Sequence, residues 1–295
     1  MRKQIRCIAM CMAVIFSLAG CGSNTTGGSD MSDSHYSVSN EDNKTELETA
    51  STEQTTSNEQ TNPTMQTDTA LKTTIYTIKG IDFKMILVEA GTFTMGSDNT
   101  NVAFSESPAH KVTLTQDYLM GETEVTEALW NAVMGNGGGS NTNPKTSVTW
   151  NEAHTFVDRL TEIACEQGLI SDDMRFRLPT EAQWEFAAKG GNLSKGYLYS
   201  GSNDINEVAV TYENSGSNAP IDVKTKAPNE LGLYDMSGNA YEWVDDYGGD
   251  YSAEEQTNPQ NTSGRNYVKR GGSNYHSFDS VSYTHLRAHE TDQYL

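Results

Sequence analysis

The stretch Arg177-Leu-Pro-Thr-Glu-Ala-Gln-Trp-Glu-Phe-Ala-Ala188 carries the signals of a short helix. Thr180 and Gln183 have the spacing of a capping box, in which each side chain accepts a hydrogen bond from the backbone N–H of the other residue. Gly190 and Gly191 follow, and glycine readily adopts the left-handed conformation that ends a helix. The sequence therefore predicts a helix that begins after Thr180 and ends before Gly190.

Two more helices are predicted upstream. Thr126 can cap a helix over Glu127–Met134, and Glu127 places an acid in the first turn, where the helix dipole favours one. Residues 149–152 again fit a capping box. The run behind them has apolar residues at helical spacing and Gly168 as its end: Ala153, Phe156, Val157, Leu160 and Ile163. Cys165 lies near the end of this helix, and we interpret it as a small apolar side chain rather than a reactive thiol.

The remaining elements are short and strand-like. Strands are predicted at Thr74–Ile78, Phe83–Val88, Gly91–Met95 and Lys111–Leu114, the last with alternating apolar residues. Beyond Gly191 the chain is rich in Gly, Asn and Tyr and has few periodic stretches. The pattern indicates an α+β fold with much irregular structure.

The first 20 residues have the composition of a secretory signal. Arg2, Lys3 and Arg6 precede an apolar run over residues 7–19, which is too short to span a bilayer as an anchor. The run ends in Leu-Ala-Gly-Cys21, which resembles a bacterial lipobox, where the cysteine is lipidated and becomes the mature N-terminus. The alternative is an ordinary signal with a chance cysteine. We expect an exported protein that is anchored through Cys21 to a bacterial membrane, with its domain outside the cytoplasm.

Charge and composition divide the rest of the chain. Residues 21–72 are mostly small polar and acidic residues, which predicts a disordered tether; ordering on a partner is the alternative. The domain follows at 73–280. The whole chain has 40 acidic and 20 basic residues and a net charge of −20. This excess of acid argues against nucleic-acid binding and against docking on anionic lipids through a basic patch.

Six motifs in order resemble one family. They are residues 91–97, 124–130, 148–153, 177–188, 229–243 and 270–273. Together they are similar to the sulfatase-modifying-factor domain, the family of the formylglycine-generating enzyme. The resemblance implies a variant of the C-type lectin fold, an α+β fold with small antiparallel sheets, few helices and much irregular structure. It also implies an oxidase that converts a sulfatase Cys or Ser into formylglycine, using copper(I) held by two cysteines after the Gly-Gly-Ser motif.

This chain departs from the family at those two cysteines. His276 and Val281 stand at the family's cysteine positions, and Cys165 is the only cysteine in the domain. Copper(I) prefers soft thiolate ligands, so we expect no copper site and assign no catalytic residue. His276 alone has no evident partners for a metal, and we interpret it as a structural or surface residue.

The resemblance also implies a calcium site. The matching positions are Asp235 and Glu242 through their side chains and Gly238 and Ala240 through their backbone carbonyls. Oxygen ligands from a tight loop suit calcium. The alternative is a loop that closes without metal, with Glu242 as a surface acid. The resemblance places a possible cleft at Tyr241, Ser273, Asn274 and His276, where Tyr241 and Asn274 replace the tryptophans usual in the family.

The tail over residues 281–295 does not match the family's basic, aromatic C-terminal segment. It resembles translated adapter sequence, so we expect the C-terminus of the domain to be incomplete. The favoured function is a lipoprotein that binds a protein, peptide or glycan at the cell envelope without catalysis. The alternative is a formylglycine-generating enzyme. An iron-dependent sulfur-oxidising enzyme on this fold would need a His-rich partner domain that the sequence lacks.

Overall fold

The computed structural model describes residues 72–98, 106–137, 139–217 and 219–274, together with three short strands nearer the N-terminus. These are β1 (Ala9–Cys11), β2 (Val14–Phe16) and β3 (Thr67–Asp68). Cys21, His276, Val281, most of the predicted tether and the tail lie outside the described residues, so the predictions made for them stay predictions.

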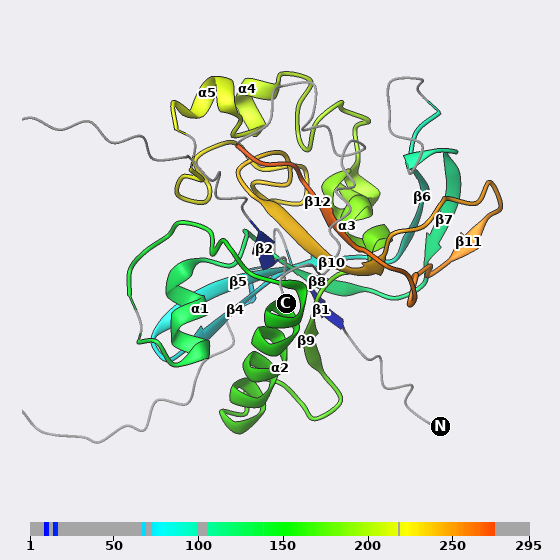
Figure 1. The fold of residues 1–295 in the computed structure, drawn as a ribbon. Helices are drawn as coiled ribbons and strands as arrows, with labels where there is room; N and C mark the ends of the chain where they lie inside the picture. Colours follow the sequence, from blue (N-terminus) through cyan, green and yellow to red (C-terminus); the bar gives the residue numbers. More distant parts are fainter. Residues whose placement is uncertain are drawn as a thin grey trace, which may run out of the picture. The chain divides into compact units, whose positions relative to one another are not determined.

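The largest sheet has six strands in the order β3-β4-β5-β8-β1-β9 (Figure 1). β4 (Thr73–Ile78) and β5 (Ile81–Val88) form an antiparallel hairpin. Lys79 and Gly80 between them both have positive φ, as a two-residue turn that follows the twist of the strands requires. β8 (Tyr118–Gly121) pairs with β5, and β1 lies between β8 and β9 (Arg175–Arg177), parallel to both. The predicted signal segment thus contributes two strands in the full-length chain, β1 to this sheet and β2 to a second one.

Two three-stranded sheets complete the fold. In one, β10 (Tyr241–Tyr247) lies between β12 (Tyr267–Arg270) and β2. In the other, β7 (His110–Leu114) lies between β6 (Gly91–Met95) and the short β11 (Gln256–Thr257). All four predicted strands are confirmed as β4, β5, β6 and β7. The sequence analysis missed β10, because nearly all of its residues are buried, including two acids, and no polar alternation marks it.

The predicted helices are confirmed as α1 (Glu127–Met134), α2 (Trp150–Glu166) and α3 (Glu181–Ala188). The capping boxes of α2 and α3 are both present, and the Thr126 side chain accepts a hydrogen bond from the Leu129 N–H at the start of α1. A 3-10 turn, Gly191–Leu193, and two one-turn helices follow: α4 (Ile205–Val208) and α5 (Tyr212–Ser215). The fold is α+β with few helices, as predicted.

The apolar core forms two main clusters. One joins α1 and α2 to the hairpin β4–β5, and Cys165 packs, partly buried, against it. The other surrounds α3, whose Trp184 is fully buried, and includes residues of β7, β8, β10 and β12. α3 therefore sits against β6, β10 and β12, where the charged residues described below meet. Within the described part of the chain, no helix is both long and apolar enough to cross a membrane.

Candidate metal-binding loop and charged cluster

The loop from Asp235 to Glu242 turns sharply before it enters β10. Asp235, Gly238 and Asn239 all have positive φ, at 57°, 84° and 58°. A Cβ at Gly238 would lie 2.1 Å from the carbonyl oxygen of Val210, so only glycine fits there. The Gly238 N–H donates to the carbonyl of Gly271 at 2.7 Å, and the Asn239 N–H donates to that of Val210 at 2.8 Å. The loop is therefore held in one conformation by backbone contacts to two distant segments.

The structure places all four predicted calcium positions on this loop. Asp235 and Glu242 are buried, at 2% and 1% exposure, so the alternative that Glu242 is a surface acid is wrong. Oδ2 of Asp235 accepts a hydrogen bond from the Lys224 N–H at 2.8 Å, while its Oδ1 has no partner among the described residues. A Cβ built on Gly271 would lie 3.8 Å from the Ala240 carbonyl oxygen and 3.9 Å from Oε1 of Glu242. The Ala240 carbonyl oxygen and Oε1 of Glu242 therefore both lie close to Gly271.

The charges around the loop favour a bound cation. Burial raises the pKa of Glu242 to about 8, although the Trp184 indole donates to its Oε2 at 2.6 Å and lowers it. Burial also raises the pKa of Asp235 to about 6. A cation would stabilise both carboxylates and supply a partner for Oδ1 of Asp235. Within the described ranges, no three Asp, Glu, His or Cys side chains form a metal-binding group. The ligands that the resemblance implies, two carboxylates and two backbone carbonyls, are oxygen donors of the kind that calcium binds.

Glu124 is a residue of this loop region that the sequence analysis did not assign. It lies in the short segment between β8 and α1, and its Oε2 accepts a hydrogen bond from the Asn239 side-chain amide at 2.7 Å. Its Oε1 accepts from the Ala240 N–H at 3.0 Å. Burial, then the charges of Asp235 and Glu242, raise its pKa well above the ordinary value. More than one hundred residues separate Glu124 from the loop, so no local spacing rule connects them.

Three of the predicted cleft residues are buried around the same loop. The Asn274 N–H donates to the Asn239 carbonyl at 2.9 Å, and its side-chain amide donates to the Ser217 carbonyl at 3.2 Å. Tyr241 is buried, with the Lys269 ammonium 4.3 Å from the centre of its ring. Ser273 is also buried. Tyr241, Ser273 and Asn274 lie close to the candidate calcium loop, and none of them lines the polar cleft described below.

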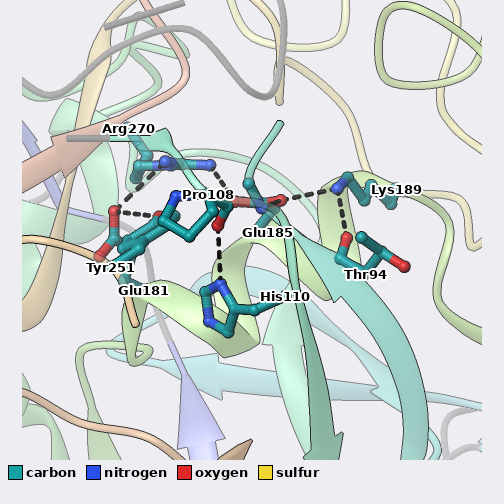
Figure 2. Close-up of polar contacts among 9 residues, drawn as sticks. Thr94, Pro108, His110, Glu181, Glu185, Lys189, Tyr251 and Arg270 are labelled. Carbon is teal, nitrogen blue, oxygen red and sulfur yellow. Dashed lines mark hydrogen bonds and ion pairs between the residues drawn. The ribbon is translucent and has the colours of Figure 1, made fainter. Parts of the chain in front are cut away.

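A charged cluster of Arg270, Glu181, Glu185 and Lys189 lies beside α3 (Figure 2). The Arg270 guanidinium is 1% exposed; its Nη2 lies 2.7 Å from Glu185 Oε2 and its Nη1 lies 3.3 Å from Glu181 Oε1. Lys189 donates to Glu185 Oε1 at 2.7 Å and to the Thr94 carbonyl at 2.7 Å. Burial opposes the charge of Glu185, but Lys189 and Arg270 outweigh it and lower the pKa of that carboxyl. This cluster is internally neutral and joins α3 to β6 and β12.

A polar cleft of about 480 Å³ opens on the outer side of the charged cluster. It is bordered by the start of β7, the first residues of α3 and the segment 246–261. Asp246 is one of its lining residues, and its two carboxylate oxygens accept from the Glu181 N–H at 2.8 Å and the Asn261 N–H at 2.7 Å. Burial raises the pKa of Asp246 to about 7. The sequence analysis did not find this cleft, because its walls come from four separate parts of the chain: Met95, His110, the start of α3 and the segment 246–261.

Comparison with known proteins places the chain in a family. Residues 81–293 match the model of the sulfatase-modifying factor enzyme 1-like domain. The chaperone protein LppX of Paenibacillus barcinonensis is 31% identical over 204 residues, covering 54% of this chain and 70% of LppX. The formylglycine-generating enzyme of Mus musculus is 26% identical over 249 residues, covering 64% of this chain. The match spans 66% of the length of the mouse enzyme. The match to the formylglycine-generating enzyme of Bos taurus spans only 29% of the length of that enzyme.

A solved structure agrees with this assignment. Treponema denticola variable protein 1 superposes with a TM-score of 0.63 and 30% identity, covering 74% of this chain and 93% of that one. The α+β fold with small sheets is therefore the fold of these relatives, as the resemblance implied. Because the matched region makes up more than half of the sequence, this protein belongs to the sulfatase-modifying factor enzyme 1-like domain family, which includes the formylglycine-generating enzyme.

Proposed function

We propose that this protein is a lipid-anchored lipoprotein whose family domain binds a partner at the outer face of a bacterial membrane and does not form formylglycine. One observation carries the proposal. His276 and Val281 stand where the active family members have their two copper-binding cysteines. The only cysteine beyond Cys21 is Cys165, which is packed against the core on α2. A single, partly buried thiol does not provide the thiolate pair that copper(I) requires.

The relatives favour a polypeptide as the partner. LppX is named a chaperone, and a chaperone acts on other polypeptides. The signal and lipobox at residues 1–21 support export and anchoring, with the acidic tether as a spacer between membrane and domain. Palmitate labelling of the expressed protein should be lost in the Cys21→Ala variant. Labelling that persists would overturn the anchor.

The absence of catalysis can be tested directly. The mature protein is incubated with copper(I), oxygen and a Cys-x-Pro-x-Arg peptide, and aldehyde formation is followed by mass spectrometry. We expect no aldehyde. The double variant His276→Cys/Val281→Cys is the matched comparison, because it restores the thiol pair; it should bind copper(I) where the natural chain does not. Aldehyde formation by the natural chain would establish the alternative, a formylglycine-generating enzyme.

Calcium is the proposed cofactor, held by Asp235, Gly238, Ala240 and Glu242. The support is twofold: buried carboxylates with raised pKa values, and a carboxylate oxygen of Asp235 that has no hydrogen-bond partner among the described residues. The ion would fix the loop that leads into β10 and thereby the buried residues Tyr241 and Asn274 beside it. Its role in the proposal is structural support of the binding domain.

A further inference from the structure

His110, the first residue of β7, presents a hydrogen-bond acceptor to the polar cleft. Its side chain is 5% exposed, and Nδ1 lies 3.1 Å from the Pro108 carbonyl oxygen (Figure 2). A carbonyl oxygen can only accept, so in the neutral ring Nδ1 carries the proton and Nε2 is the acceptor. The ring packs edge-on against Tyr251 at 5.0 Å. Within the described part of the chain Nε2 has no hydrogen-bond or ionic partner, and the residue lines the cleft.

Acidic residues also line the cleft. Asp250 is exposed, whereas Asp246 and Glu181 are buried. Gln256 and Thr257 line it as well, and their side chains can accept as well as donate. The Gln260 side-chain amide donates to the Asp245 carbonyl at 2.8 Å, so the oxygen of that amide is the group left for a ligand. The Arg270 guanidinium is bound on the far side of Glu181 and does not line the cleft. The cleft therefore offers several acceptors and no cationic side chain among the described residues that line it.

This chemistry selects a cationic hydrogen-bond donor. The volume of about 480 Å³ is within the range of small-ligand sites. The ring of Tyr251 forms one wall, and an aromatic face attracts a cation. An organic cation with several N–H donors satisfies both the charge and the acceptors.

We propose that the polar cleft binds the guanidinium or ammonium group of an arginine or lysine side chain on a partner polypeptide, with His110 Nε2 accepting one of its N–H groups. Asp250, which is exposed and lines the cleft, supplies the negative charge. The identification of the ligand as part of a polypeptide rests on the proposed function; its charge and donor character rest on the cleft alone. The net charge of −20 adds a long-range attraction for a basic partner.

The test uses the mature protein and two blocked tripeptides, acetyl-Gly-Arg-Gly-amide and its citrulline counterpart. Each peptide is titrated into the protein by calorimetry, and ¹⁵N spectra of the histidine rings are recorded in parallel. Citrulline keeps the shape and removes the charge. We expect the arginine peptide to bind roughly tenfold more tightly, the factor of about one charge-assisted hydrogen bond. The Nε2 signal that shifts should be that of His110.

Two variants and a control localise the binding. Asp250→Asn should weaken the arginine peptide several-fold; this side chain is exposed, so the variant should fold. His110→Phe keeps the ring against Tyr251 but removes the acceptor, and should reduce the preference for arginine over citrulline. Asp222→Asn makes the same charge change at an exposed position outside the cleft and should leave binding unchanged.

Equal binding of the two peptides, no binding of the arginine peptide at millimolar concentration, or an Asp250→Asn variant that binds like Asp222→Asn would each overturn the cleft proposal. None of these results bears on the aldehyde assay. Conversely, aldehyde formation by the natural chain would overturn the proposed function and leave the binding measurement intact. The two failures are therefore distinguishable.

Discussion

Glu124 shows how much one buried side chain can contribute to a loop distant in sequence. Both of its carboxylate oxygens accept from N–H donors, one on the Asn239 side chain and one on the Ala240 backbone. An amide in its place would turn an NH₂ group toward one of these donors. The site therefore requires a carboxylate, even though burial disfavours the charge.

At this residue we predict that Glu124→Gln lowers the free energy of unfolding by about 1–3 kcal/mol, the cost of leaving a buried donor without an acceptor. Urea unfolding of the two proteins measures the difference. Glu162→Gln makes the same chemical change at an exposed position of α2 and should alter stability by less than about 0.5 kcal/mol. A Glu124→Gln protein as stable as the natural one would contradict the role of this carboxylate.

At the scale of elements, the loop 235–242 links β10 to the segments at Val210 and Gly271. Three features fix its conformation. Asp235, Gly238 and Asn239 have positive φ, two backbone hydrogen bonds of 2.7 and 2.8 Å hold it, and the carboxylate of Glu124 accepts from its backbone. The acids that these contacts bury give the loop an excess of negative charge. These contacts hold the loop in one shape, and we propose that a cation offsets the charge of its acids.

For this element we predict that chelation of calcium lowers the melting temperature of the purified protein, because an ion that binds only the folded state stabilises it by mass action. Thermal melts with excess calcium and with excess chelator measure the effect. Asp235→Ala removes the oxygen that lacks a partner and should abolish most of the difference between the two melts. Identical melts of the natural protein under both conditions would count against bound calcium.

At the scale of the whole molecule, the buried acids give the metal-free protein an unusual dependence on pH. Burial raises the pKa of Asp235 from 3.8 to about 6, of Asp246 from 3.8 to about 7 and of Glu242 from 4.5 to about 8. The folded state therefore holds protons that the unfolded chain has already released. Their contribution is favourable below about pH 4 and is lost as the pH rises toward 8.

We accordingly predict that the chelator-treated protein unfolds at a lower urea concentration at pH 8 than at pH 5. Each group contributes at most about 1.4 kcal/mol per pH unit. The pKa of Glu185 is lowered from 4.5, so its contribution to the free energy of unfolding changes only below the range from pH 5 to pH 8. The comparison is repeated at high salt, which screens repulsion between surface acids but affects buried groups less. Stability that rises from pH 5 to pH 8 would refute the prediction, and added calcium should reduce the fall.

Much of the fold could be predicted because its signals are local. The capping boxes at Thr149 and Thr180 fix the first turn of α2 and α3 through contacts only three residues apart, and both are present. The alternation in Lys111–Leu114 marks a strand with one buried face. β10 carries no such pattern, because both of its faces are covered and acids occupy buried positions. Its burial depends on α3, which lies about sixty residues earlier.

By itself, the sequence determined the family, the α+β class, the starts of three helices and the four positions of the candidate calcium loop. It could do so because these follow from short motifs and local spacing. Only the tertiary structure decided that Glu242 is buried, that Glu124 holds the loop, and that His110 and Asp250 border one polar cleft. Those facts depend on burial and on contacts between segments far apart in the chain, and neither is encoded in the spacing of neighbouring residues.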